Sequence, residues 1–491
     1  MFVDRSDLLA DATPVRGYGV AVTPGRNGPL VFVAGYGEAN RLYTDEGGRL
    51  VDTACGIVAD RDRHGMGVCA ADLDGDGCEE IYVHNCANSV GIGGDSDLLL
   101  DRLEADRYRW TDTFALPVNG DRLNFRAGRS VAALDRHGTG RYGVAVASHG
   151  APLAFYELGE DGEASDMADS VGLTVEDGCQ SLLPGPLCGP GTDLFVGVEN
   201  GPNRLFRNDG GHYGPVDGGR DLADPDSDAR GVALVDEGGT LALALGNWEG
   251  RSRLLRRGAD GRFRDAESHP LAATERVRAV VAADFDNDGR EELFCNALGV
   301  PNRLFERVDL RPRSGSSATS ATQTGENERT GDDGGCDRAT SPRASGWITT
   351  EAGAATEPAG YGTGAVAADL DGDGVLELVV VHGEVAAQPV SVYAVPDAAA
   401  NGWLRVRPIT AQGAPARGAM VRLETTAGTQ RRVIDAGGGY LCQTEPVAHF
   451  GLGGTEPQRA VVRWPDGRER VLVAPAANAE HDVPHPSTRN P

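Results

Sequence analysis

The stretch Asp72-Leu73-Asp74-Gly75-Asp76-Gly77-Cys78-Glu79-Glu80 decides the fold of this chain. The same pattern returns in Asp284–Glu292 and in Asp369–Glu377. Each copy carries acids at loop positions 1, 3, 5 and 9, with a glycine at position 6 where the chain must turn sharply. Alternate residues of a tight loop can point to the same side, so the acids converge on one point. They repel one another unless a hard cation neutralises them, and oxygen ligands of this kind suit Ca²⁺.

Each of the three loops is therefore predicted to bind one Ca²⁺ through the side chains at positions 1, 3, 5 and 9 and through the backbone carbonyl at position 7. The predicted ligands are Asp72, Asp74, Asp76, Cys78 and Glu80 in the first loop, Asp284, Asp286, Asp288, Arg290 and Glu292 in the second, and Asp369, Asp371, Asp373, Val375 and Glu377 in the third. An EF-hand is excluded, because position 12 holds Val83, Cys295 or Val380 in place of a bidentate glutamate. The alternative is a plain turn in which the aspartates cap backbone groups.

Short apolar runs flank each loop and predict the strands that it joins. Val68–Ala71 precedes the first loop, and Ile81–Val83 follows it. Runs of this length, bounded by glycine and aspartate turns, are typical of buried strands. Each loop is thus predicted to be the turn of a hairpin.

Degenerate copies of the loop recur along the chain. They are Thr23–Gly28, Asp135–Gly140, Pro186–Gly191 and Asp236–Gly239. Together the copies give seven units, mostly about 50 to 60 residues apart, a period that suits the four-stranded blade of a propeller. We expect no metal at the Asp135 loop, because His137, Thr139 and Gly143 stand where the other loops have acids.

Two further motifs predict the third and fourth strands of these units. An Asn-Arg-Leu sequence followed by an aromatic residue marks the third strand, at Asn40–Tyr43, Asn203–Phe206 and Asn302–Phe305. An aromatic residue with an acid two positions later marks the fourth strand, as in Phe263–Asp265.

The seventh unit lacks a fourth strand of its own, and the N-terminus offers one. Phe2 and Asp4 have the same offset as the aromatic residue and acid of the fourth-strand motif. We therefore predict that Phe2–Arg5 pairs beside Val390–Tyr393 as the outer strand of the seventh blade and removes an open sheet edge.

The sequence thus predicts an all-β protein, a seven-bladed β-propeller followed by a small antiparallel β domain. Residues 1–398 are expected to form the propeller, and residues 311–346, which contain hardly any apolar residue, a disordered insert in its sixth blade. In residues 399–483 apolar and polar residues alternate, as in strands with one solvated face, and this range is predicted to be the small domain. Residues 484–491 are predicted to be a disordered tail.

The composition limits the partners and the chemistry. The 491 residues carry a net charge of −27 and contain no lysine. Such a charge disfavours nucleic acid and anionic membranes, and we interpret it as adaptation to high salt, which screens self-repulsion. The missing lysine excludes a Walker A loop and a Schiff base. No signal peptide and no membrane span is visible, which predicts a cytoplasmic protein. The nine cysteines are interpreted as small buried residues, with a Cys179–Cys188 pair as the alternative.

Beyond this, the chain resembles a known family. The hairpin loops and Asn-Arg-Leu-Phe strands resemble FG-GAP/VCBS repeats, as in the integrin α-subunit propeller. The C-terminal part is similar to an ASPIC/UnbV domain, whose marks are Asn401–Leu404, Gly439–Gln443, His449–Gly453 and Trp464–Gly467. The two together resemble the cartilage acidic protein family, although Cys442 stands where that family usually has serine. The resemblance implies calcium binding, a role in interaction or adhesion, and an extracellular location as the alternative to the cytoplasm.

No catalytic motif accompanies these repeats. The sequence has neither an H-E-x-x-H motif nor a G-x-S-x-G elbow. We therefore predict a calcium-stabilised, monomeric scaffold without catalytic activity that binds a protein or carbohydrate partner of unknown identity. The alternative is a propeller enzyme that acts on a polysaccharide or a small metabolite in the axial channel.

Overall fold

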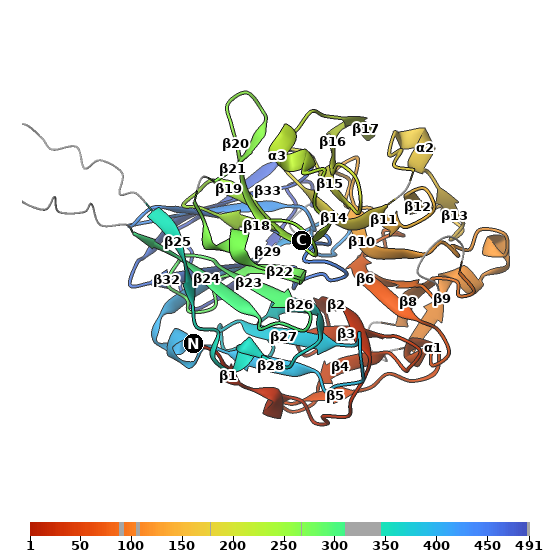
Figure 1. Cartoon of the computed structure of the whole chain (residues 1–491), viewed down its shortest axis with the longest axis horizontal. Helices are drawn as coiled ribbons and strands as arrows, with labels where there is room; N and C mark the ends of the chain where they lie inside the picture. The colour runs from red at the N-terminus through yellow and green to blue at the C-terminus, as the bar shows by residue number, and fades with distance from the viewer. Residues whose placement is uncertain (88–92, 105–108, 177, 267, 310–344, 489–491) are drawn as a thin grey trace, which may run out of the picture.

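The computed structural model describes residues 1–491 except 88–92, 105–108, 177, 267, 310–344 and 489–491 (Figure 1). The regular secondary structure of the described chain is mostly β-strand. Its helices are single turns: α1 (Gly56–Ala59), α2 (Ala168–Val171), α3 (Arg220–Ala223), η1 (Ser6–Leu8), η2 (Thr113–Ala115), η3 (Pro117–Asn119), η4 (Pro270–Ala273), η5 (Gly353–Thr356) and η6 (Pro396–Ala400). No helix among the described residues is long and apolar enough to cross a membrane.

Seven four-stranded antiparallel sheets follow one another along the chain, and each of the seven predicted turns joins the first two strands of one sheet. They are β2 (Gly17–Pro24), β3 (Pro29–Gly35), β4 (Arg41–Asp45), β5 (Leu50–Asp52); β6 (Gly65–Ala71), β7 (Glu80–Asn85), β8 (Leu98–Glu104), β9 (Arg109–Asp112); β10 (Gly128–Leu134), β11 (Gly143–Ser148), β12 (Ala154–Leu158), β13 (Ala164–Asp166); β14 (Cys179–Gly185), β15 (Asp193–Val198), β16 (Arg204–Asp209), β17 (His212–Pro215); β18 (Ala229–Asp236), β19 (Leu241–Asn247), β20 (Arg253–Arg257), β21 (Phe263–Asp265); β22 (Val277–Ala283), β23 (Glu292–Ala297), β24 (Arg303–Asp309), β25 (Ser345–Thr350); and β26 (Gly362–Ala368), β27 (Glu377–His382), β28 (Ser391–Ala394), β1 (Val3–Asp4).

The first strands of these sheets contact one another in chain order. β2 contacts β6, and the series continues through β10, β14, β18 and β22 to β26, which contacts β2 again. We call this arrangement the ring (Figure 1). The sheets bury their apolar side chains against the neighbouring sheets, which explains why no single repeat can fold alone.

The prediction for the N-terminus is confirmed. β1 pairs with β28, with Val3 opposite Ala394 and Asp4 opposite Tyr393. The Phe2 side chain is 1% exposed and packs edge-on against Phe285 at a centroid distance of 5.0 Å. The first residues of the chain therefore complete the last sheet of the ring.

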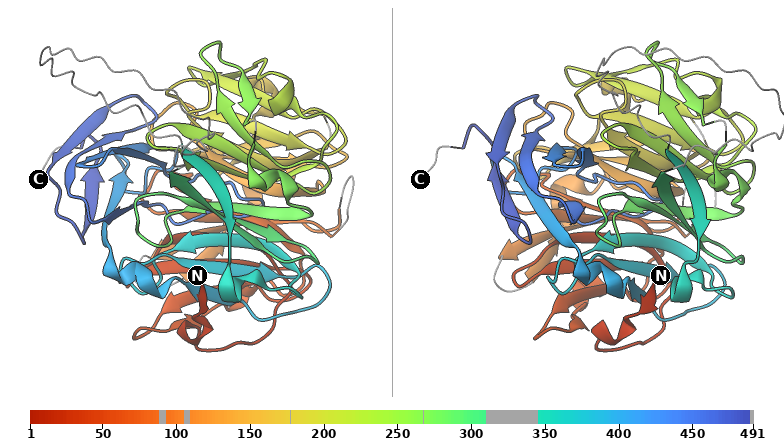
Figure 2. Two further views of the ribbon diagram at one scale, coloured as in Figure 1. Left: turned by 60° about the vertical axis from the view of Figure 1, so that its left-hand side comes forward. Right: turned by 90° about the vertical axis from the view of Figure 1, so that its left-hand side faces the viewer.

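Two further sheets, which we call the C-terminal sheets, lie against one side of the ring (Figure 2). Their strands are β32 (Ala448–Gly453), β29 (Gly402–Ile409) and β35 (Glu480–Pro484) in one sheet, and β31 (Thr429–Val433), β30 (Met420–Thr425), β33 (Pro457–Arg463) and β34 (Glu469–Val473) in the other. They enclose a core of their own, which includes Leu404, Phe450 and Trp464. The predicted alternating strands are present, while β32 and β35 were not predicted. The prediction of a purely antiparallel domain is wrong, because β35 pairs parallel to β29.

Two predicted boundaries need correction. Residues 345 and 346, assigned to the disordered insert, belong to β25, and the rest of that insert, residues 311–344, lies outside the described residues. The predicted tail is partly ordered, because Pro484 ends β35 opposite Ile409. His485 is 6% exposed and contacts the Trp464 ring at a centroid distance of 5.3 Å.

The segment between β31 and β32, residues 434–447, runs through the centre of the ring, and we call it the central segment. It makes backbone hydrogen bonds with the first strands of five sheets: Ala133 N–H to Ala436 O, Gly439 N–H to Val232 O, Val280 N–H to Gly439 O, Val68 N–H to Leu441 O and Gln443 N–H to Val20 O. Glycine on the ring side permits this close approach, since a Cβ on Gly364 would lie 2.6 Å from Cys442 Sγ. The C-terminal sheets are thereby tied to the axis of the ring.

Candidate metal centres

Each acidic loop brings three carboxylates together. In all three loops, one oxygen each from the acids at positions 1, 3 and 9 lies within 4.8 Å of the others. The groups are Asp72, Asp74 and Glu80; Asp284, Asp286 and Glu292; and Asp369, Asp371 and Glu377. Positions 1 and 9 are buried because they flank the turn at the end of one buried strand and the start of the next.

Backbone N–H groups of the same loop hold these carboxylates in place. In the first loop Asp72 accepts hydrogen bonds from the N–H of Gly75 at 2.6 Å and of Gly77 at 3.1 Å. Glu80 reaches back across the loop to the N–H of Leu73. The third loop repeats this pattern, with Glu377 accepting from the N–H of Leu370 at 2.8 Å. Local hydrogen bonding therefore fixes the acids before any ion binds.

The acids at position 5 lie outside these groups. Asp76, Asp288 and Asp373 each accept the backbone N–H of position 7, at 2.7 to 2.8 Å. Their oxygens shape the turn, and the structure does not gather them with the other three acids. The ligand set of positions 1, 3, 5, 7 and 9 stays a prediction, with positions 1, 3 and 9 supported by geometry.

The buried oxygens of these groups are not satisfied by the protein. Glu80 Oε1, Asp284 Oδ1 and Glu377 Oε1 are buried and have no hydrogen-bond partner among the described residues. Burial raises the pKa of Asp72 to about 7 and that of Glu377 to about 9, and it raises the pKa of Glu292 well above the ordinary glutamate value. A buried oxygen without a partner is costly, and a bound cation would both satisfy it and keep the acids ionised. The residues therefore fit a hard cation.

Arginines from the C-terminal sheets reach all three loops. Arg417 is fully buried and pairs with Glu79 at 2.6 Å. Arg432 lies 3.1 Å from Glu291 and 3.7 Å from the predicted ligand Asp284. Arg405 lies 3.6 Å from Asp369, a predicted ligand of the third loop.

Further contacts of the second and third loops connect them to each other and to the C-terminal sheets. Asn287 donates a hydrogen bond to Gly374 O at 2.9 Å, and its own Oδ1 lies 2.6 Å from His449 Nε2. Arg405 also pairs with Glu445 of the central segment at 2.6 Å. The loops thus form the contact surface between the ring and the C-terminal sheets.

Sequence reasoning did not identify these arginines. One signal was available: the first two loops have glutamate at position 8 as well as position 9, and position 8 (Glu79, Glu291) is the acid that the arginines contact. Nothing near Arg417 in the sequence indicates that its partner lies 338 residues away.

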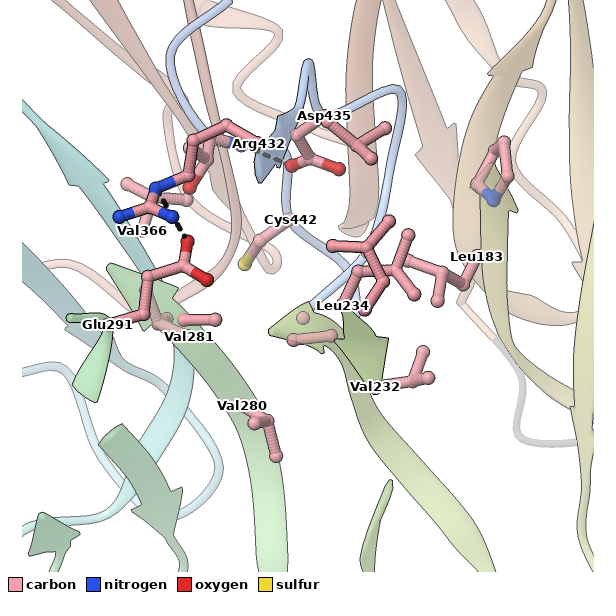
Figure 3. A pocket seen from close by; sticks show the side chains of 18 of the residues that line it. Leu183, Val232, Leu234, Val280, Val281, Glu291, Val366, Arg432, Asp435 and Cys442 are labelled. Carbon is pink, nitrogen blue, oxygen red and sulfur yellow. Dashed lines mark hydrogen bonds and ion pairs between the residues drawn. The ribbon is translucent and has the colours of Figure 1, made fainter. Parts of the chain in front are cut away.

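A small cavity of about 100 Å³ remains beside the central segment (Figure 3). Apolar residues such as Val232 and Val280 line it, together with the Glu291–Arg432 ion pair, Asp435 and Cys442. Asp435 accepts the N–H of Gly437 and Thr444, so its carboxylate holds the bend of the central segment.

Eight cysteines lie in the described part of the chain, and no disulfide joins any two of them. Cys179 and Cys188 do not pair. Five of the eight are buried, which agrees with their interpretation as small apolar residues.

The comparisons with known proteins agree with the fold. The family model "ASPIC and UnbV" matches residues 410–490, and the model "FG-GAP-like repeat" matches residues 235–295. The fold and the acidic loops thus define an all-β protein of FG-GAP-like repeats with a C-terminal ASPIC/UnbV module. Cartilage acidic protein 1 of Xenopus tropicalis is 38% identical to the chain over 97% of its residues and 75% of the relative's length. The proteins of the same name from Mus musculus and Homo sapiens are also 38% identical, over 75% and 73% of their lengths. The chain belongs to the cartilage acidic protein family.

Proposed function

We propose that the chain is a binding scaffold without catalytic activity, built as a seven-bladed, integrin α-like β-propeller that three Ca²⁺ ions stabilise. The propeller comprises residues 1–398, and the C-terminal sheets form a second module that begins at residue 399 and includes Pro484 and His485. The observation that carries the proposal is the threefold recurrence of one carboxylate group with an unsatisfied buried oxygen. Ca²⁺ fits better than Mg²⁺, because it accepts irregular sets of six to eight oxygens whereas Mg²⁺ requires a near-ideal octahedron.

The residues that fill the centre of the ring favour a scaffold over the alternative, an enzyme with a substrate channel along the axis. The central segment occupies the middle of the ring and hydrogen-bonds to five of its first strands. A substrate channel along the axis would have to displace it. The relatives also carry a name that denotes no catalytic activity.

The name of the relatives refers to cartilage, which favours the extracellular alternative over the cytoplasmic one for this chain. Extracellular calcium is abundant enough to fill sites with affinities of about 10⁻⁴ to 10⁻³ M. The net charge of −27 supports the further proposal of a high-salt environment. A partner is expected to be neither nucleic acid nor an anionic membrane, and the scaffold is proposed to be a monomer.

Calorimetric titration tests the calcium proposal. We expect three Ca²⁺ per chain, and a melting temperature that rises with free Ca²⁺ because ligand binding stabilises the folded state by about 2.7 kcal/mol per site at 100 times Kd. Glu80→Gln keeps the shape of a buried ligand and is expected to lower the stoichiometry to two. Asp135→Asn, in the degenerate loop, is the matched control and is expected to leave three sites. Identical melting curves with Ca²⁺ and with a chelator would refute the proposal.

A further inference from the structure

The end of the ring opposite the acidic loops carries a concentration of arginines. Arg16 immediately precedes β2, and Arg129, Arg230, Arg276 and Arg278 lie at or next to the starts of β10, β18 and β22. The acidic loops, in contrast, follow the ends of first strands. The whole chain has a net charge of −27, so five arginines at one end of the axis differ markedly from its acidic composition. We call these five residues the arginine cluster.

Tyr440 of the central segment lies at the middle of the arginine cluster. The guanidinium carbons of Arg230 and Arg278 lie 5.8 and 5.9 Å from the centre of its ring, and Arg278 Nη1 lies 3.4 Å from its hydroxyl. Arg278 also stacks on Trp248, at 4.5 Å. Aromatic faces hold guanidinium groups by cation–π attraction and leave their N–H edges free to donate.

The backbone around this site is strained. Tyr440 has a φ of 91° and Leu441 a φ of 62°, and Arg276 has a φ of 52°. Residues other than glycine rarely adopt such angles, and they persist where the surrounding structure imposes them, often at functional sites. Here the hydrogen bonds of the central segment to the ring impose the position of Tyr440.

The hydrogen-bond donors of the arginine cluster exceed its acceptors. Arg230 is only 7% exposed, yet its Nε and Nη1 have no hydrogen-bond partner among the described residues, and neither has Nε of Arg278. Glu199 pairs with Arg230 and Glu384 pairs with Arg278, each at 3.2 Å. Within the described part of the chain, the other three arginines make no ion pair. Three positive charges and several buried N–H groups are therefore unmatched, which is unfavourable unless an anion binds.

We propose that the arginine cluster binds an oxyanion, the carboxylate, sulfate or phosphate group of a ligand that approaches the ring from the side away from the C-terminal sheets. Guanidinium groups recognise such planar or tetrahedral anions through paired N–H donors. The half-buried Trp248 provides an apolar surface for the part of the ligand next to the anion, while the buried Tyr440 holds the arginines in place. This binding does not depend on calcium, so its failure and that of the calcium proposal are separate results.

Inorganic phosphate, sulfate and acetate serve as probes, titrated at constant low ionic strength because salt screens these charges. Tryptophan fluorescence reports binding through Trp248, and Trp248→Phe is expected to remove the signal without removing binding measured by calorimetry. The relative affinities of the three anions indicate which group the natural ligand carries.

Three charge-removing variants make the test specific. We expect Arg230→Gln to weaken binding of the best probe at least tenfold and Arg276→Gln, which removes an exposed and unpaired arginine, to weaken it severalfold. Arg264→Gln is the control, since Arg264 is exposed on β21 and, among the described residues, forms an ion pair only with Asp260. This substitution is expected to change affinity less than twofold. If Arg230→Gln does not melt cooperatively, Arg276→Gln decides the outcome. The proposal is overturned if no probe binds saturably or if Arg264→Gln weakens binding as much as Arg276→Gln.

Discussion

Burial and a neighbouring charge shift the pKa of His84 in opposite directions. This histidine is fully buried near the end of β7. Burial lowers the pKa of its imidazole, but the Asp97 carboxylate 2.9 Å away outweighs this and raises the pKa to about 9. The Tyr82 hydroxyl and the Asn124 amide also donate hydrogen bonds to Asp97. The folded protein therefore holds a charged histidine at neutral pH, in a cluster that sequence patterns did not indicate.

The raised pKa of His84 determines how the stability of the folded protein changes with pH. Because the folded value of about 9 exceeds the unfolded value of about 6.5, the contribution to stability is complete below pH 6.5 and is lost as the pH rises through 9. The loss amounts to about 3 kcal/mol, an order-of-magnitude figure. Urea unfolding from pH 6 to 9.5 measures it, and His84→Gln should remove this component. Parallel pH profiles for the two proteins would contradict the assignment.

At the scale of single elements, β1 depends on one side chain. Phe2 packs edge-on against Phe285 and Phe294, while Val3 next to it is 40% exposed. We expect Phe2→Ala to lower the free energy of unfolding by about 3 to 5 kcal/mol, as for other buried aromatic residues. Val3→Ala, the control on the same strand, should change it by less than about 0.5 kcal/mol. Equal effects of the two substitutions in urea unfolding would show that Phe2 does not hold the strand.

The strands β24 and β25 bring the ends of the long insert together. Asp309 lies directly opposite Ser345 in their register. Residues 310–344 can therefore be replaced by Asn-Gly, which favours the tight turn of a two-residue hairpin. We expect the shortened protein to melt within a few degrees of the full chain, because the replaced residues contain little apolar surface. A protein that no longer folds after the replacement would show that the insert packs on the ring.

How well the sequence predicts an element depends on how far apart along the chain the residues that determine it lie. The hairpins around Asp72 and Asp284 are specified by turn residues and apolar runs within a few positions, so they were predicted. The carboxylates at positions 1, 3 and 9 converge for the same local reason. Arg417, by contrast, follows Gly-Ala-Pro-Ala, a sequence typical of an exposed loop, and its burial depends on the distant Glu79. The path of the central segment likewise depends on contacts with five separate sheets.

At the scale of the whole molecule, we expect the proposed cations to be coupled to the packing of the C-terminal sheets on the ring. Asp284 lies 3.7 Å from Arg432 and also accepts the backbone N–H of Gly451 in β32. Without a cation, these buried acids are expected to take up protons, because burial raises the pKa of both Asp284 and Glu292 well above their ordinary values. A neutral Asp284 no longer attracts Arg432 as an ion.

Hydrogen exchange tests this coupling. We expect a chelator to accelerate amide exchange in the central segment and in β32 at least tenfold. Exchange in β11 and β12, whose sheet has no complete acidic loop, should change little and serves as the internal control. Uniform acceleration over the whole chain would instead indicate global loss of stability, and no acceleration would show that the loops and the C-terminal sheets are independent.

The pairing of β1 with β28 also dictates an order of events during synthesis. Val3 is made before its partner Ala394, which lies 391 residues further along the chain. The N-terminal residues must therefore stay unpaired, with Phe2 exposed, while six sheets form behind them. Contacts over such a sequence separation make folding slow and leave apolar surface open to association in the meantime. The central segment is made later still, so the nascent ring has to remain able to admit it. The sequence separation between β1 and β28, more than the folding of any single sheet, therefore sets how long this chain needs protection from aggregation.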